Sequence, residues 1–289
     1  MIRIRFRDIA SLLRVTTQNW LNDRGPRLGA ALAYYMALSL APSVVIILAV
    51  AGLAFDPKAA QSRLILQIQG LMGKQVATVI QTVIHGADRP FGGFAATALG
   101  LFTLFFGATA MISELRDSLN TIWKVPIDTT SGHVRSMVNL AGERLVSFAI
   151  VLGVGVFLLA SLVVHSWITE TGQHLSSVGA PPYLLVRAVS GVISFLIVTG
   201  LVALAFKFLP NVSLKWADVV TGAVFTALLF TLGRFLLGVY LGAAHFADSY
   251  GTAGSLVVFL VWVYYSAQVL YFGAEFTRAY SQTRAHGAQ

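Results

Sequence analysis

The chain has no cysteine and few charged residues. None of its 289 residues is Cys, and Asp, Glu, Lys and Arg together make up 11% of it, against about 25% in soluble domains. The lack of Cys excludes disulfides, thiolate metal sites and cysteine nucleophiles, and it leaves the redox compartment open. Hydrophobic residues account for 56% of the chain, in long and evenly spread runs. This composition indicates an integral membrane protein rather than a soluble domain.

Enzyme motifs are missing as well. The sequence has no Gly-Lys-Ser/Thr phosphate loop, no GxSxG elbow and no carboxylate cluster for two metal ions. Its histidines are scattered, without the paired spacing of a zinc site. We therefore expect no enzymatic activity, no catalytic residue, no cofactor and no bound metal.

Acidic residues are scarcer than basic ones, 12 against 20. The basic residues lie at the N-terminus and in short connecting segments, a distribution that orients a protein in a membrane better than it binds phosphates. We expect membrane lipids as partners and no nucleic acid. Residues 1–26 have no continuous apolar core, so no cleavable signal peptide is apparent and the first span is expected to act as the targeting signal.

Six apolar segments are long enough to cross a bilayer, which needs about 20 residues. They make the chain an all-α, polytopic membrane protein with a single domain over 1–289. A basic segment over 1–29 precedes the six-helix bundle of 30–276, and a short tail over 277–289 follows it. The expected spans are 30–55, 94–112, 145–167, 183–208, 218–243 and 255–276.

Two regions outside the spans have helical spacing of apolar residues. Residues 56–93 read as two amphipathic helices on the outer side, which either cap a cavity or rest on headgroups. Residues 1–27 read either as an amphipathic helix on an anionic surface or as a solvated basic lead-in. Beyond the second span, a helix carrying the candidate functional residues Asn120 and Trp123 is expected to emerge on the basic side.

The orientation follows from the Lys and Arg residues of the connecting segments. Fourteen lie on the side of both termini, and four lie on the other side, all in the 56–93 link. The positive-inside rule then places both termini in the cytoplasm. A homo-oligomer is compatible with this arrangement.

Arg234 is the most informative charged residue, because an Arg within a span costs about 2.5–3.5 kcal/mol on insertion scales. It either faces a bundle interior or snorkels to the nearer surface. Arg187 begins the fourth span, within reach of outer headgroups. Glu275 and Arg278 lie one helical turn apart, where an interfacial ion pair or a proton-binding carboxyl is expected.

Pro42 lies within the first span and leaves the Leu38 carbonyl without its donor. Ser39 can satisfy the backbone locally, or else Tyr35, Ser39 and Pro42 form a deformable, polar-lined part of a pathway. At the entry to the last span, Tyr250, Gly251 and Gly254 read as a turn that feeds a helix.

Several motifs, in this order, carry a family resemblance. They are LAYYMALSLAPSVV at 32–45, SLNTIWKV at 118–125, FLP at 208–210, GRFLLGVYL with Arg234 and Tyr240 at 233–241, and YGTAGSLVVFLVWVYYSAQVLYFGAEF at 250–276. With them the chain resembles the YihY/BrkB family of bacterial inner-membrane proteins. The resemblance implies six helices with both termini inside. It also implies an association with virulence, and with envelope lipid export for some relatives. Members were formerly mislabelled ribonuclease BN, a label that the residues here argue against.

Two functions remain open from the sequence. The first is a transporter or translocator of a lipid or a small, anionic solute, without its own ATPase. Arg234 would attract the anionic group, with Glu275 and the turn at 250–254 at opposite ends of the path. The second is a non-transporting envelope scaffold that recruits partner proteins through its basic face.

Overall fold

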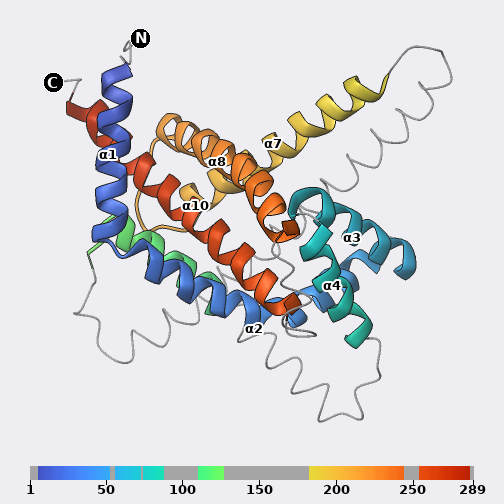
Figure 1. The fold of residues 1–289 in the computed structure, drawn as a ribbon. Helices are drawn as coiled ribbons and strands as arrows, with labels where there is room; N and C mark the ends of the chain where they lie inside the picture. Colours follow the sequence, from blue (N-terminus) through green and yellow to red (C-terminus); the bar gives the residue numbers. More distant parts are fainter. Residues whose placement is uncertain are drawn as a thin grey trace, which may run out of the picture.

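The computed structural model describes residues 6–52, 56–72, 74–87, 110–126, 182–243 and 254–286. Within these residues the chain is helical and contains no strand, as expected (Figure 1). The helices are α1 (Phe6–Asn22), α2 (Gly25–Gly52), α3 (Pro57–Met72), α4 (Lys74–Ala87), α7 (Pro182–Phe208), α8 (Trp216–Ala243) and α10 (Gly254–His286). A further helix covers residues 110–122.

Three of the described helices are long and apolar enough to cross a membrane. The qualifying segments are Gly191–Phe208, Trp216–Leu237 and Leu256–Arg284. They coincide with the fourth, fifth and sixth expected spans, and α2 covers most of the first. The expected spans 94–112 and 145–167 lie outside the described residues, except for 110–112.

The outward surface of α8 is apolar, as expected for a surface in contact with lipid. Its exposed positions follow one another at intervals of about one turn and are apolar: Val220, Val224, Leu228, Leu232, Phe235, Leu236 and Val239. The side of α8 that faces the bundle is buried and largely apolar, as at Val219, Ala223 and Ala227. A helix that is apolar on all sides is typical of a membrane span, whose outer face meets acyl chains instead of water.

α10 is the central helix of the bundle and contacts α1, α2, α4 and α8 (Figure 1). Its buried residues Ala267, Tyr271 and Ala274 join a core with residues of α2, α7, α8 and the 110–122 helix. Nearer its start, Phe259, Trp262 and Val263 join a second core with α2 and α4. Every other described span therefore packs on α10 directly or through one intermediate helix.

α8 and α10 run antiparallel and approach closely at glycines. A Cβ atom added to Gly222 would overlap Thr277, and one added to Gly273 would overlap Thr226. Each threonine hydroxyl donates to the glycine carbonyl one turn earlier in its own helix, at 2.7 Å. Such small residues let membrane helices pack by close van der Waals contact, since lipid supplies no hydrophobic drive between them.

The basic N-terminal region forms a helix that is docked on the bundle. α1 contacts α10, and the ring of Trp20 meets that of Phe272 edge-to-face at 6.3 Å. Thr16 of α1 is fully buried. This packing contradicts one of the two alternatives for this region, a basic segment that is surrounded only by solvent. The start of α1 and the end of α10 lie on the same side of the bundle (Figure 1).

α3 and α4 are the two helices expected between the first two spans. Asp56 caps α3, because its carboxylate accepts hydrogen bonds from the backbone of Lys58 and Ala59 at 3.0 and 3.2 Å. The apolar face of α4, including Val76 and Ile80, is buried against α2 and α10. The expectation that α4 only rests on headgroups is therefore wrong, because protein already covers its apolar side.

Candidate functional site: a buried charge cluster beside α10

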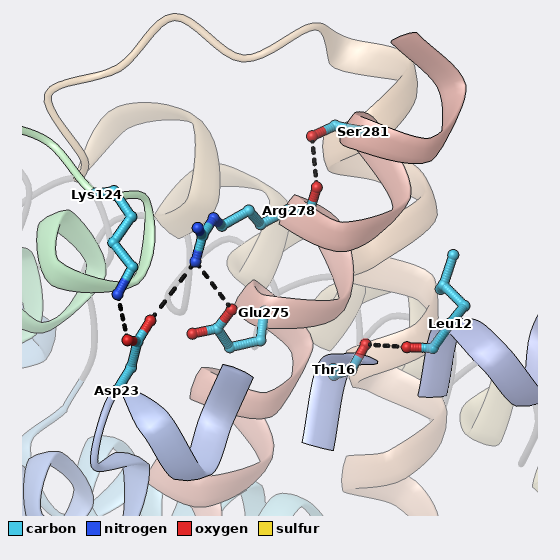
Figure 2. Close-up of polar contacts among 7 residues, drawn as sticks. All are labelled: Leu12, Thr16, Asp23, Lys124, Glu275, Arg278 and Ser281. Atoms are coloured by element: carbon cyan, nitrogen blue, oxygen red, sulfur yellow. Dashed lines mark hydrogen bonds and ion pairs between the residues drawn. The ribbon is translucent and has the colours of Figure 1, made fainter. Parts of the chain in front are cut away.

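Four charged side chains from three parts of the chain meet beside the last third of α10. Asp23 comes from the α1–α2 turn, Lys124 from the end of the 110–122 helix, and Glu275 and Arg278 from α10 (Figure 2). The Arg278 Nη1 atom lies 3.6 Å from Asp23 Oδ2 and 3.6 Å from Glu275 Oε2. Lys124 Nζ pairs with the other oxygen of Asp23. We call these four residues the charge cluster.

Two left-handed backbone positions aim the residues from outside α10. Lys124 has φ 54°, and the Val125 and Lys124 amides bond back to the carbonyls of Asn120 and Thr121 at 3.0 and 3.1 Å. This pattern is a Schellman cap with Lys124 at the position that usually takes glycine. Arg24, directly after Asp23, has φ 56° and ends α1 in a related way. Both helices therefore stop where a charged side chain can reach the cluster.

Glu275 is the most buried member of the cluster. Its side chain is 0% exposed, and neither carboxylate oxygen has a hydrogen-bond partner. The expected pairing with Arg278 is present, at 3.6 Å between Arg278 Nη1 and Glu275 Oε2. α10 continues to His286, and Glu275 lies beside Asp23 of the α1–α2 turn. A buried acceptor without a donor is costly, so this carboxyl needs a proton, a water or a ligand.

More unpartnered polar groups follow the same face of α10. Gln268, Tyr271 and Glu275 are spaced by three and four residues, which places them on one side of a helix. The Gln268 Oε1 and Tyr271 hydroxyl atoms are buried without a hydrogen-bond partner, as is the hydroxyl of Ser118 beside Tyr271. The cluster thus lies at one end of a row of polar side chains on α10.

Two residues expected to be functional, Asn120 and Trp123, lie next to the cluster on the 110–126 segment. The Asn120 Oδ1 atom accepts a hydrogen bond from the backbone N–H of Asn211 at 2.8 Å. This bond connects the segment to the loop between α7 and α8. The Trp123 ring packs edge-to-face on Phe206 at 5.6 Å. Both residues position the end of the 110–122 helix, and with it Lys124.

Arg234 is half-buried on α8, away from the charge cluster. Because Gly222 faces Thr277 and Gly273 faces Thr226, Glu275 is level with position 224 of α8. Ten residues at 1.5 Å each then separate Arg234 from that level, or about 15 Å along the axis. Tyr240 is exposed further along the same helix. Arg234 and Glu275 therefore do not form one site.

Tyr35 and Ser39 lie on α2. Tyr35 is half-buried and packs edge-to-face on Tyr34, with ring centroids 5.7 Å apart. Ser39 is buried and donates to the Met36 carbonyl at 3.1 Å, with Met111 Sδ at 3.7 Å. Its expected role at the freed Leu38 carbonyl is wrong, because a helical serine reaches carbonyls three or four residues back.

Other expected site residues lie partly or wholly outside the described part of the chain. α2 continues through Pro42, and α7 includes Arg187, but the surroundings of these side chains are not described. Gly254 begins α10. Tyr250 and Gly251 fall outside the described residues.

Asp23 is the functional candidate that sequence reasoning missed. It lies in the segment NDRGP at 22–26, whose Asp, Gly and Pro are typical of a turn between two helices. The signal marks the turn but does not reveal its distant partners in 110–126 and α10. Within the described ranges, no three His, Asp or Glu side chains gather as a metal site would require.

The chain is similar to known bacterial membrane proteins over nearly its whole length. A family model described as "Virulence factor BrkB" matches residues 16–289. A "UPF0761 membrane protein" from Tolumonas auensis is 26% identical over 89% of this chain and 80% of its own length. Proteins of the same name from Azotobacter vinelandii and Alcanivorax borkumensis are 27% and 29% identical over 98% and 67% of this chain. The chain spans 66% and 43% of those two relatives, and no solved structure matches it.

Proposed function

The chain belongs to the virulence factor BrkB family of membrane proteins, and on that premise we propose that it translocates a lipid or a small anionic solute across the bacterial inner membrane. It would do so without an ATPase of its own. Both termini would face the cytoplasm, in agreement with the excess of basic residues in the segments on their side.

The observation that carries this proposal is the charge cluster. Its central residue, Glu275, lies inside a candidate span and is fully buried without a hydrogen bond. Ionisable groups within membrane segments are expensive and typically mark substrate or ion pathways. A scaffold protein would gain nothing from keeping such a group without a hydrogen bond, whereas a translocator needs polar groups that change partners.

Arg234 adds a second polar point on the neighbouring span. It is half-buried on α8, roughly 15 Å from the level of Glu275 along the helix axis. A guanidinium at this depth binds phosphate or carboxylate groups well, because its fork of donors matches their oxygens. This chemistry supports an anionic substrate group, such as a phospholipid headgroup or a small acid.

Reconstitution tests the proposal. Wild-type protein in phosphatidylethanolamine–phosphatidylglycerol vesicles should move fluorescent phospholipids, or a fluorescent anionic solute, faster than protein-free vesicles do. Arg234→Ala should slow this movement severalfold, since the anionic group loses its partner. Gly191→Ala is the matched control, because a Cβ there meets no atom within 4 Å.

The proposal fails if wild type and Arg234→Ala both stay at the rate of protein-free vesicles for every probe. Stoichiometric crosslinking to one protein partner, unaffected by Arg234→Ala, would then favour the alternative of a non-transporting envelope scaffold.

A further inference from the structure

Two buried carboxylates on neighbouring spans have opposite surroundings. Asp218, at the start of α8, is 6% exposed and accepts a hydrogen bond from Arg284 Nη1 at 3.0 Å. Glu275 is more deeply buried, yet its nearest cation, Arg278 Nη1, is 3.6 Å away. That distance is too long for a hydrogen bond. Asp218 is therefore a satisfied anion, and Glu275 is not.

The cations near Glu275 are shared with a second acid. Arg278 Nη1 lies as far from Asp23 Oδ2 as from Glu275 Oε2, and Lys124 pairs with Asp23. Asp23 Oδ2 also lacks a hydrogen-bond partner, although its side chain is only 8% exposed. Two carboxylates from separate elements thus approach one guanidinium, and three of their oxygens have no donor.

A single proton resolves this arrangement. Ionised carboxylates only accept hydrogen bonds, so two adjacent ones repel and leave their oxygens unpaired. One proton turns one of them into a donor for the other, as in acid pairs that share a proton. We propose that Asp23 and Glu275 form a carboxyl pair that binds one proton, and that this proton is the coupling ion of the translocation.

The other groups around the pair fit this assignment. Lys124 comes from the 110–126 segment, Arg278 lies on α10, and Tyr271 lies one turn before Glu275. Without the proton, the two negative charges of the acids cancel the two positive charges of Lys124 and Arg278. With the proton bound, the cluster has a net charge of +1. An anionic group that enters this end of the bundle would neutralise that charge, so proton and anion would bind together.

Proton release would also change the contacts between elements. Asp23 belongs to the α1–α2 turn, and its contact with Arg278 links that turn to α10 (Figure 2). When both acids are ionised, they compete for Arg278. This competition weakens either the Asp23–Arg278 contact or the Glu275–Arg278 pair within α10. The pair therefore couples a proton to the packing of three segments at one end of the bundle.

Infrared titration of purified protein in lipid nanodiscs tests proton binding directly. Wild type should show a protonated-carboxyl band that persists at pH 6–7 and disappears at higher pH. Glu275→Gln should lose this band, and Asp23→Asn should shift its titration, because the pair is broken. Asp218→Asn is the matched control: it removes a buried but hydrogen-bonded carboxylate and should leave the band unchanged.

The inference is overturned if the band survives in Glu275→Gln, or if wild type has no protonated carboxyl at pH 6. The coupling role rests on the proposed translocation, whereas proton binding does not. A titrating band without vesicle transport would reject the proposed function alone. Transport that keeps its pH dependence in Glu275→Gln would reject the coupling alone.

Discussion

Gly222 of α8 lies directly against Thr277 of α10, and one turn away Thr226 lies against Gly273. The two contacts fix one antiparallel register, in which each helix offers a groove to the other's threonine. The register also sets the depth of Glu275 relative to α8. Packing between these two spans therefore determines where the charge cluster lies.

We expect Gly222→Ala to destabilise the protein by about 1–3 kcal/mol. The added Cβ would overlap Thr277, and overpacking of a close helix contact forces the helices apart. Gly191→Ala makes the same chemical change in α7, where the Cβ meets nothing, and should leave the melting temperature unchanged or higher. Thermal unfolding in detergent measures both variants.

A second variant separates crowding from loss of glycine. Adding Thr277→Gly to Gly222→Ala removes the side chain that clashes and should recover part of the lost stability. If Gly222→Ala were as stable as Gly191→Ala, the close contact between α8 and α10 would be refuted.

The protein should be more stable with glycine at position 124 than with alanine there. Both variants lose the charge, but the φ of 54° costs an L-residue roughly 1–2 kcal/mol and costs glycine little. Lys124→Gly is therefore expected to exceed Lys124→Ala by about 1 kcal/mol in unfolding free energy. Thr121, an exposed position in the preceding helix, should show the reverse order. Equal stabilities of the two Lys124 variants would contradict the left-handed cap.

The sequence predicts much of the fold because apolar helices have a regular pattern. The expected starts of α7, α8 and α10 each lie within two residues of the observed ones. The depth of Glu275 could not be predicted, because its pairing with Arg278 fits both a surface and a buried setting. What buries it is the α1–α2 turn around Asp23, a contact across some 250 residues of chain that no local pattern encodes.

Glu114 should make the protein less stable as the pH rises. It lies beyond the second expected span, and burial raises its pKa above the ordinary 4.5. The Asp117 charge raises the pKa further, and the nearby Ser118 hydroxyl opposes both effects. The folded state therefore holds this proton more tightly than the unfolded state does. Its contribution to stability is complete below pH 4.5 and is lost as the pH rises through the folded pKa.

Glu114→Gln should accordingly stabilise the protein at neutral pH and have little effect near pH 4. Melting temperatures from pH 4 to pH 8 test this difference. Asp117→Asn removes only the smaller, electrostatic cause and should give a weaker change in the same direction. A pH-independent difference between Glu114→Gln and wild type would contradict the raised pKa.

Tyr271→Phe should leave stability unchanged or raise it slightly. The Tyr271 side chain is fully buried, and its hydroxyl has no hydrogen-bond partner, so its removal ends a desolvation cost without breaking a bond. Thr226→Val is the comparison, because it removes a buried hydroxyl that donates to Gly222 at 2.7 Å and should cost about 1 kcal/mol. Unfolding curves give the stabilities.

Vesicle transport that falls in Tyr271→Phe despite intact stability would assign this hydroxyl to the polar path that leads to Glu275. A large loss of stability would instead mean that the hydroxyl is hydrogen-bonded in the membrane.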